Sequence, residues 1–273
     1  MTNQTTTGRI AKKFQDLTIK DAFLFAAVMS DPLQCQKLLE LVLEMKILKV
    51  NVIAERSMAY HPEYHGIRLD VYAEEDGHHR RFNVEMQVKN DDDLPRQSRF
   101  YYSHLDMDSL NTGRRYKNLP DTYVIFICDF PLFGERPLYR YTYRSACLEN
   151  GHILPDGRTT VFLSTKGTND EEVPKPLVDF LKYIEHPENP PKQVLDDGFV
   201  ASLNKQVRTI KRNHDWEAKF MQLEEMLKDE REIGQNRVTQ LMALLLEQNR
   251  MDDLKRAVSD KNYQKKLFEE FGL

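Results

Sequence analysis

The sequence predicts an α/β protein in which a mixed sheet is flanked by helices and followed by an all-helical C-terminal extension. Residues 67–74 and 81–89 alternate apolar and polar side chains with period two, which is typical of paired strands. The run YVIFIC at 123–128 is continuously apolar, as in a strand buried on both faces of an α/β sheet. Beyond residue 195, apolar residues recur every three or four positions, which predicts helices.

Two helices are expected before the first strand. Apolar residues recur at helical spacing over 21–48, with a break at Asp31 and Pro32. Aspartate followed by proline is typical of a helix N-cap with proline in the first turn. The first three elements are therefore predicted as helices over about 17–29 and 32–46, and a short strand over 50–55.

The two alternating stretches are predicted to form a hairpin. Asp76 and Gly77 lie between them, and Asp-Gly is a strong signal for a tight hairpin turn. A loop at 61–66 precedes the hairpin, and a helix follows it from Leu94 to about Asn111, stopped at 112–113. The remaining elements before residue 190 are predicted as strands over 138–144 and 160–164, and a helix over 174–186.

The prolines at 187–191 (PENPP) indicate a linker between two regions of different composition. We therefore predict a flexible arm over 1–16, an α/β domain over 17–190 and a helical region over 195–273. The three-four spacing in the last region is of coiled-coil or bundle type, so these helices are expected to form a homo-oligomer or to bind a partner.

Composition limits where the protein acts and how it meets charged partners. With 273 residues and a formal net charge of −4, any contact with nucleic acid must come from a local basic patch. The three cysteines lack CxxC spacing and predict reduced thiols. No apolar run reaches the roughly 20 residues that span a bilayer, and the first residues carry no apolar signal-peptide segment. We expect a cytoplasmic protein without membrane contact.

The polar face of the hairpin brings candidate site residues together. If the apolar residues face inward, Asp70 faces outward on the first strand, and Glu85 and Gln87 do so on the second. The turn places Asp70 opposite a position within 83–85. Adjacent carboxylates repel each other unless a cation lies between them, and such hard oxygen ligands suit Mg²⁺ or Mn²⁺. The same pattern is also typical of an ordinary solvated hairpin face.

The helix after the hairpin is a candidate DNA contact. Arg96, Arg99 and Tyr102 are spaced at three and are expected to share one face. Residues 96–117 contain five basic side chains against two acidic ones. Basic residues position phosphates and aromatic rings stack on exposed bases, so we predict that these three residues bind DNA. The alternative is an amphipathic helix with solvated arginines and buried aromatic residues.

The order αβββαβ, with an aspartate on one strand and E-x-[K/Q] on the next, resembles the PD-(D/E)XK nuclease superfamily. Within it, four stretches resemble the Rpn family of bacterial recombination-promoting nucleases, also described as transposases. These stretches are 66–75 (GIRLDVYAEE), 83–88 (NVEMQV), 94–102 (LPRQSRFYY) and 123–128 (YVIFIC). The resemblance covers roughly residues 17–190.

The resemblance implies Mg²⁺-dependent DNA cleavage associated with recombination or mobile DNA. Asp70 and Glu85 would be catalytic metal ligands, and Gln87 would position the attacking water. Gln87 stands where many superfamily members have lysine, and glutamine supplies no positive charge. The alternative is a catalytically weak or inactive module that acts in DNA binding or protein interaction, as a phage-defence or toxin-like component. In some superfamily members an acid of the first helix joins the site, which makes Glu40 and Glu44 further candidates.

Overall fold

The computed structural model describes residues 12–58, 67–77, 79–90, 92–110, 115–196 and 198–273. The described chain forms two compact units, residues 12–216 and residues 217–273, and each is treated separately below. The loop expected at 61–66 and the helix stop expected at 112–113 lie outside the described residues.

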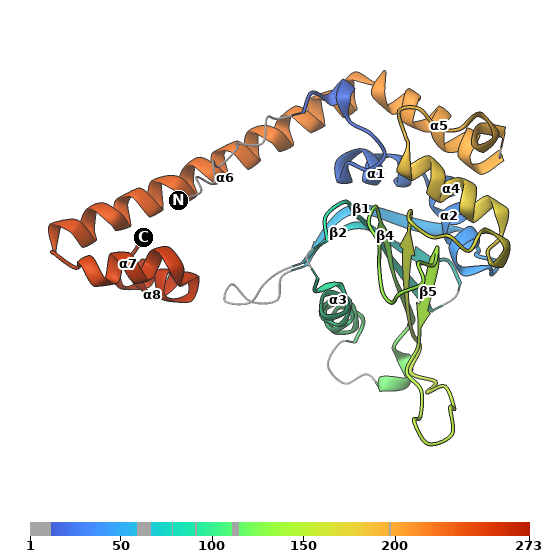
Figure 1. Cartoon of the computed structure of the whole chain (residues 1–273), viewed down its shortest axis with the longest axis horizontal. Coiled ribbons are helices and arrows are strands. Elements are labelled where there is room, and N and C mark those ends of the chain that lie inside the picture. Colours follow the sequence, from blue (N-terminus) through green and yellow to red (C-terminus); the bar gives the residue numbers. More distant parts are fainter. Residues whose placement is uncertain (1–11, 59–66, 78, 91, 111–114, 197) are drawn as a thin grey trace. The chain divides into compact units, whose positions relative to one another are not determined.

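The first unit is built on a six-stranded mixed sheet with the strand order β1-β2-β3-β4-β6-β5 (Figure 1). β2 pairs antiparallel with both of its neighbours, β1 and β3. β4 and β6 run parallel to β3, and β5 pairs antiparallel with β6 at the edge of the sheet. The predicted mixed sheet is thereby confirmed. The strands are β1 (Val50–Met58), β2 (Ile67–Glu75), β3 (Arg80–Gln87), β4 (Asp121–Cys128), β5 (Arg140–Tyr143) and β6 (Arg158–Ser164).

Helices cover both faces of this sheet, as an α/β architecture requires. Figure 1 shows α1, α2, α4 and α5 on one side of the sheet and α3 on the other. The α3 helix connects the parallel strands β3 and β4, so it packs on the sheet as a crossover. The helices are α1 (Ala22–Met29), α2 (Pro32–Leu43), α3 (Leu94–Ser109), α4 (Lys175–Glu185) and α5 (Gly198–Lys211). Short 3-10 turns span Phe14–Asp16, Tyr116–Asn118, Asp170–Glu172 and Lys192–Asp196.

Local sequence signals account for the first helix boundary and for the hairpin turn. The Asp31 side chain accepts a hydrogen bond from the Leu33 backbone N–H at 2.9 Å, and Pro32 begins α2, as predicted. Gly77 adopts a positive φ of 76° between β2 and β3, which a side chain would disfavour. The α2 helix ends at Leu43, earlier than expected, because Glu44 turns into the left-handed region with φ 52°.

The first unit extends beyond both ends of the predicted α/β domain. Phe14, expected in a flexible arm, is buried and packs edge-on against Phe23. At the other end, α5 buries an apolar stripe against α1 and α4 and continues the core of the unit. Gln34 also donates a hydrogen bond to Ser202 of α5 at 2.7 Å. The unit therefore ends at Trp216 rather than near residue 195.

The second unit is helical, as predicted. It contains most of α6 (His214–Glu247), together with α7 (Met251–Ser259) and α8 (Lys261–Phe271). The α7 and α8 helices pack on α6 around a small core of Leu241, Leu245, Ala257 and Leu267. Asp260 caps α8 by accepting the Tyr263 backbone N–H at 3.0 Å, directly after the end of α7 at Ser259. None of the helices that the structure describes is both long and apolar enough to cross a membrane.

Candidate active site

The central hairpin brings two carboxylates into register. Val71 pairs with Val84, so the next pair along the antiparallel strands is Asp70 with Glu85. The backbone N–H of Asp70 donates to Glu85 Oε1 at 3.3 Å, and the backbone N–H of Met86 donates to Asp70 Oδ2 at 3.0 Å. Each carboxylate therefore accepts a main-chain hydrogen bond from the opposite strand, and the two acidic groups are held side by side.

Burial makes this pair electrostatically unusual. Glu85 is only 3% exposed, whereas Asp70 is half-buried. Burial, followed by repulsion from the Asp70 charge, raises the pKa of Glu85 well above its ordinary value. A solvated hairpin face would leave both acids in water, so the alternative that the sequence left open does not describe Glu85. Glu85 therefore holds its proton more tightly than an exposed glutamate does.

The α3 helix supplies a hydroxyl to the buried carboxylate, and sequence reasoning missed it. The Tyr101 hydroxyl donates a hydrogen bond to Glu85 Oε2 at 3.5 Å. The same hydroxyl accepts a hydrogen bond from Gln97 Nε2 at 2.7 Å. The ring of Tyr101 stacks on Phe126 of β4, so its position is fixed by the core. The available signal was the spacing of four between Gln97 and Tyr101, which places both on one helix face.

Tyr101→Phe should make Glu85 harder to ionise without disturbing the core. The Tyr101 hydroxyl favours the ionised form of Glu85, so its removal should raise the pKa of Glu85 further. For a divalent metal ion held by this carboxylate, the concentration for half-maximal occupancy should rise by roughly tenfold, about the value of one hydrogen bond to a charged group. Gln97→Ala is the matched variant, because it removes the hydrogen bond that Gln97 donates to the Tyr101 hydroxyl but keeps the hydroxyl itself. A Tyr101→Phe protein with unchanged Mg²⁺ dependence would contradict this role.

The three residues predicted to bind DNA do not share one environment. Arg96 and Arg99 are exposed on α3, as a phosphate contact requires. Tyr102 is buried, with its hydroxyl 3.1 Å from Thr160 Oγ1 and the guanidinium of Arg158 over its ring. The Tyr102 ring is thus part of the core between α3 and the sheet, as the amphipathic alternative expected, and has no open face for a base.

The acids of α3 are neutralised by cations from other elements. Asp108 pairs with Arg56 at 2.9 Å and with Arg81 at 3.3 Å, and Asp106 pairs with Arg158 at 2.7 Å. These ion pairs compensate the negative charges of Asp106 and Asp108. Arg96 and Arg99 are exposed at the start of α3, where Asp92 and Asp93 of the preceding segment are exposed as well.

The acids of α2 have other partners. Glu40 accepts the backbone N–H of Ile47 at 3.1 Å, and Glu44 pairs with Arg140 of β5 at 2.8 Å. Both carboxylates are thus used to close the end of α2 and to tie it to the edge of the sheet. Neither joins the pair on the hairpin.

A second ionic cluster lies just past the end of β4, beside the end of β3. The Asp129 backbone N–H donates to the carbonyl of Gln87 at 2.9 Å and ties the two strand ends together. The Asp129 carboxylate accepts hydrogen bonds from Lys20, Thr165 and Lys166 at 2.5, 2.8 and 3.2 Å. Burial opposes ionisation, but these donors prevail and lower the pKa of Asp129. This carboxylate is therefore committed to lysines and stabilises the strand ends.

Comparison with known proteins decides the family. The family described as PD-(D/E)XK nuclease family transposase matches residues 22–196. The chain belongs to this family. The matched residues run from the start of α1 to the turn before α5 and include the whole sheet with both carboxylates of the hairpin. No match was found among curated proteins or among solved structures.

Family membership gives the chain a nuclease-like, transposase-associated domain, and nucleases of this superfamily generally use divalent metals. Among the residues that the structure describes, no three His, Cys, Asp or Glu side chains cluster closely enough to hold a metal. Mg²⁺, however, commonly takes one or two protein carboxylates and completes its shell with water and substrate phosphate. Asp70 and Glu85 are two carboxylates held side by side on the hairpin, and their oxygens are hard ligands.

Proposed function

We propose that the protein is a metal-dependent DNA endonuclease that hydrolyses phosphodiester bonds and acts on recombining or mobile DNA. The observation that carries this proposal is the pair formed by the half-buried Asp70 of β2 and the buried Glu85 of β3. Burial of a carboxylate is costly, and burial together with repulsion from Asp70 raises the pKa of Glu85, an effect that a bound divalent cation would oppose. Family membership supports the nuclease chemistry.

The chemical roles follow from the positions of these side chains. Asp70 and Glu85 would hold Mg²⁺ or Mn²⁺, and Glu85 must first lose its proton. When bound, the metal ion stabilises the negative charge that develops on the phosphodiester during hydrolysis. Gln87 lies two residues after Glu85 on the same strand, so its side chain points to the same face as Glu85. Its amide would orient the attacking water, and Arg96 and Arg99 would hold the flanking phosphates.

A plasmid nicking assay tests the proposal. Supercoiled DNA should be converted to open-circular or linear forms in Mg²⁺ or Mn²⁺, and EDTA should stop the reaction. Binding of the same DNA in EDTA, followed by no cleavage when Mg²⁺ is added, would instead support the non-catalytic DNA-binding alternative. Gln87 favours that alternative, because it leaves the developing negative charge less well compensated.

Gln87→Lys should raise the cleavage rate. A lysine here would add a positive charge on the face of the hairpin that carries the carboxylates, and that charge stabilises the transition state. We expect an increase of roughly tenfold in single-turnover rate, equal to about 1.4 kcal/mol. Gln87→Met is the matched control, since it keeps the length of the side chain but offers neither charge nor amide. A Gln87→Lys rate no higher than that of Gln87→Met would show that the missing cation does not limit the reaction.

Arg96→Ala and Arg99→Ala should each weaken DNA binding without changing its sequence dependence. Each phosphate contact that is lost should reduce the slope of log affinity against log salt by about 0.9. Fluorescence anisotropy in EDTA over a series of salt concentrations measures this slope. Arg212→Ala, at an exposed position after α5, is the matched control and should leave the slope unchanged. If the wild-type protein and all variants gave equal slopes, Arg96 and Arg99 would not contact the phosphates of the DNA.

We also infer that the second unit mediates self-association. The part of α6 in this unit exposes several large apolar side chains, namely Met221, Met226, Ile233 and Leu246. Apolar surface of this kind on a long helix favours pairing with another helix. Sedimentation equilibrium of the full chain measures the resulting mass, and a monomer at all concentrations would contradict the inference.

A further inference from the structure

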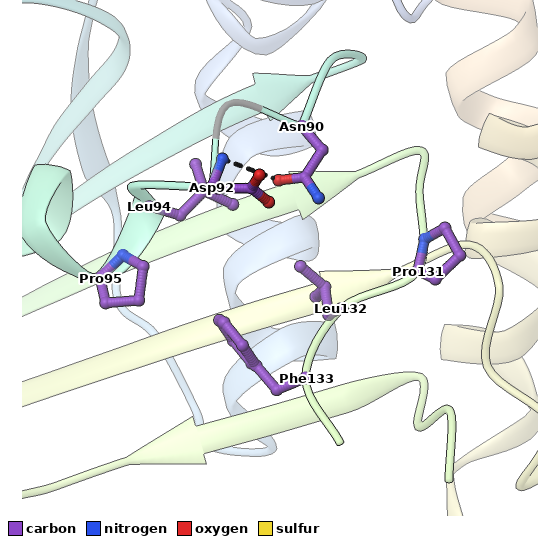
Figure 2. A pocket seen from close by; sticks show the side chains of 7 residues that line it. All are labelled: Asn90, Asp92, Leu94, Pro95, Pro131, Leu132 and Phe133. Atoms are coloured by element: carbon purple, nitrogen blue, oxygen red, sulfur yellow. Dashed lines mark hydrogen bonds between the residues drawn. The ribbon is translucent and has the colours of Figure 1, made fainter. Parts of the chain in front are cut away.

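A cavity of about 220 Å³ lies at the end of the sheet where β3 and β4 terminate. One side is formed by the segment after β3 and the start of α3, and the other by the segment after β4 (Figure 2). Asn90 lies three residues beyond Gln87, and Pro131 three residues beyond the end of β4 at Cys128. Since Gln87 and Cys128 are paired in the sheet, the cavity opens next to the proposed active site.

The lining of the cavity combines apolar walls with a polar rim. Leu94, Leu132 and Phe133 contribute apolar surface, and Asn90 and Asp92 contribute an amide and a carboxylate. Figure 2 shows the two polar side chains on one side and Leu132 with Phe133 opposite them. Flat heteroaromatic groups with polar edges suit this combination of surfaces.

The walls of the cavity are held in place by the fold. The ring of Phe133 packs edge-on against Tyr141, Tyr143 and Phe162, so its orientation is set by the aromatic core. On the other side, the Asp92 backbone N–H donates to Asn90 Oδ1 at 3.0 Å, and Asp92 adopts a left-handed φ of 57°. Aspartate is among the few residues that tolerate this conformation. The cavity is therefore a formed feature rather than a gap between mobile side chains.

We infer that this cavity holds one unpaired nucleobase of the DNA that the active site cleaves. The inference rests on the proposed nuclease function and names the class of its substrate, DNA with an extrahelical or single-stranded base beside the cut. The cavity is smaller than the roughly 300–1,000 Å³ of drug-sized ligand sites, so it accommodates a single ring system. Arg96 lies next to the lining residue Pro95 in the sequence and is exposed, so it is the candidate contact for a phosphate near the cavity.

The polar rim favours a particular type of base edge. The Asp92 carboxylate only accepts hydrogen bonds, while Asn90 still offers its amide N–H groups after accepting from the Asp92 backbone. Guanine can pair with both side chains: the N–H groups of its Watson–Crick edge would donate to Asp92, and its neighbouring keto oxygen would accept from the Asn90 amide. Burial of the ring against Leu132 and Phe133 is independent of sequence, as in other sites for unpaired bases. Guanine is thus the base with which to test the cavity.

The test is a comparison of three DNA duplexes by fluorescence anisotropy in EDTA, where no cleavage occurs. One duplex is fully paired, one carries a single unpaired guanine, and one carries an abasic nucleotide at the same place. The abasic duplex has the same backbone distortion but lacks the base. We expect the guanine duplex to bind roughly tenfold more tightly than the abasic one, within the range known for stacked bases.

Two variants connect this preference with the cavity. Leu132→Trp fills the cavity, and Asp92→Asn removes the carboxylate but tolerates the same backbone conformation. Both should reduce the preference for guanine over the abasic nucleotide to below about threefold, less than the contribution of one stacked base. Glu135→Gln removes a charge from an exposed side chain of the same segment outside the lining, and it should keep the full preference. Thermal melting confirms that each variant is folded.

The outcomes separate this inference from the proposed function. Equal affinities of the wild-type protein for the guanine and abasic duplexes would overturn the inference. So would a preference that both folded variants retain. In either case, Mg²⁺-dependent cleavage of paired plasmid DNA would leave the nuclease function standing. Failure to bind any of the three duplexes, together with an uncut plasmid, would overturn both.

Discussion

Asp70→Asn is expected to lower the rate of Mg²⁺-dependent DNA cleavage by about 1,000-fold or more, equal to at least roughly 4 kcal/mol of transition-state stabilisation. The amide is a much weaker ligand for Mg²⁺ than the carboxylate, and it removes the negative charge that attracts the ion. The fold should be preserved, because the amide oxygen can still accept the Met86 backbone N–H. Loss of activity should therefore come without loss of structure.

Single-turnover cleavage at saturating Mg²⁺ measures this effect, and anisotropy in EDTA measures DNA binding independently. Asp76→Asn is the matched control, because it makes the same chemical change at an exposed position in the turn of the same hairpin. The control should cleave at the wild-type rate. If Asp70→Asn also cleaved at that rate, Asp70 would not be a metal ligand, and a contaminating nuclease would have to be sought.

Glu85→Gln is expected to abolish cleavage and yet to stabilise the metal-free protein at neutral and higher pH. Burial and the charge of Asp70 raise the pKa of Glu85, so the folded protein holds this proton more tightly than the unfolded chain does. The stability that results is fully present below the ordinary glutamate pKa of 4.5 and is lost as pH rises through the raised value. Each pH unit in this window costs about 1.36 kcal/mol. A neutral glutamine avoids the cost.

The difference in melting temperature between Glu85→Gln and the wild-type protein in EDTA measures this linkage. It should be smallest near pH 4.5 and should increase with pH until Glu85 is fully ionised. In the difference between the two melting temperatures, the contributions of groups that titrate alike in both proteins cancel. Glu171→Gln, at an exposed position, is the matched control and should show no such trend. A difference that stays constant with pH would mean that Glu85 titrates normally in the folded protein.

Mg²⁺ should reverse the order of the two melting temperatures at high pH. A ligand that binds only the folded state stabilises it increasingly as its concentration exceeds its dissociation constant, and the ion should bind the wild-type site but not the Glu85→Gln site. Addition of Mg²⁺ at pH 8 should thus raise the melting temperature of the wild-type protein alone. An equal increase for both proteins would place the stabilising ion elsewhere.

The sequence by itself determined the secondary structure and the identity of the two acids. Period-two alternation marked β2 and β3, the continuous apolar run marked β4, and Asp31 with Pro32 marked the start of α2. These signals are local, because each depends on side chains within a few residues of one another. Once the hairpin was recognised, the strict alternation of strand side chains also placed Asp70, Glu85 and Gln87 on a common face.

The tertiary structure decided what surrounds that face. The packing of α3 on the sheet buries Glu85 and brings Tyr101 to its carboxylate, and it places Tyr102 in the core although Arg96 and Arg99 stay exposed. It also adds α5 to the first unit, because the apolar stripe of α5 finds its partners in α1 and α4. Contacts of this kind join residues far apart in the chain, so no local pattern reveals them.

The carboxylate pair shows the division most clearly. Two acids on adjacent strands can be read from the sequence, but the pKa of Glu85 is raised because α3 and the sheet exclude solvent from it. Likewise, the cavity beside them is formed by segments that follow β3 and β4, about forty residues apart in the sequence, and exists only because those strands are paired. The chain thus supplies the groups that are present, and burial by distant segments decides the pKa of Glu85 and the surroundings of each group.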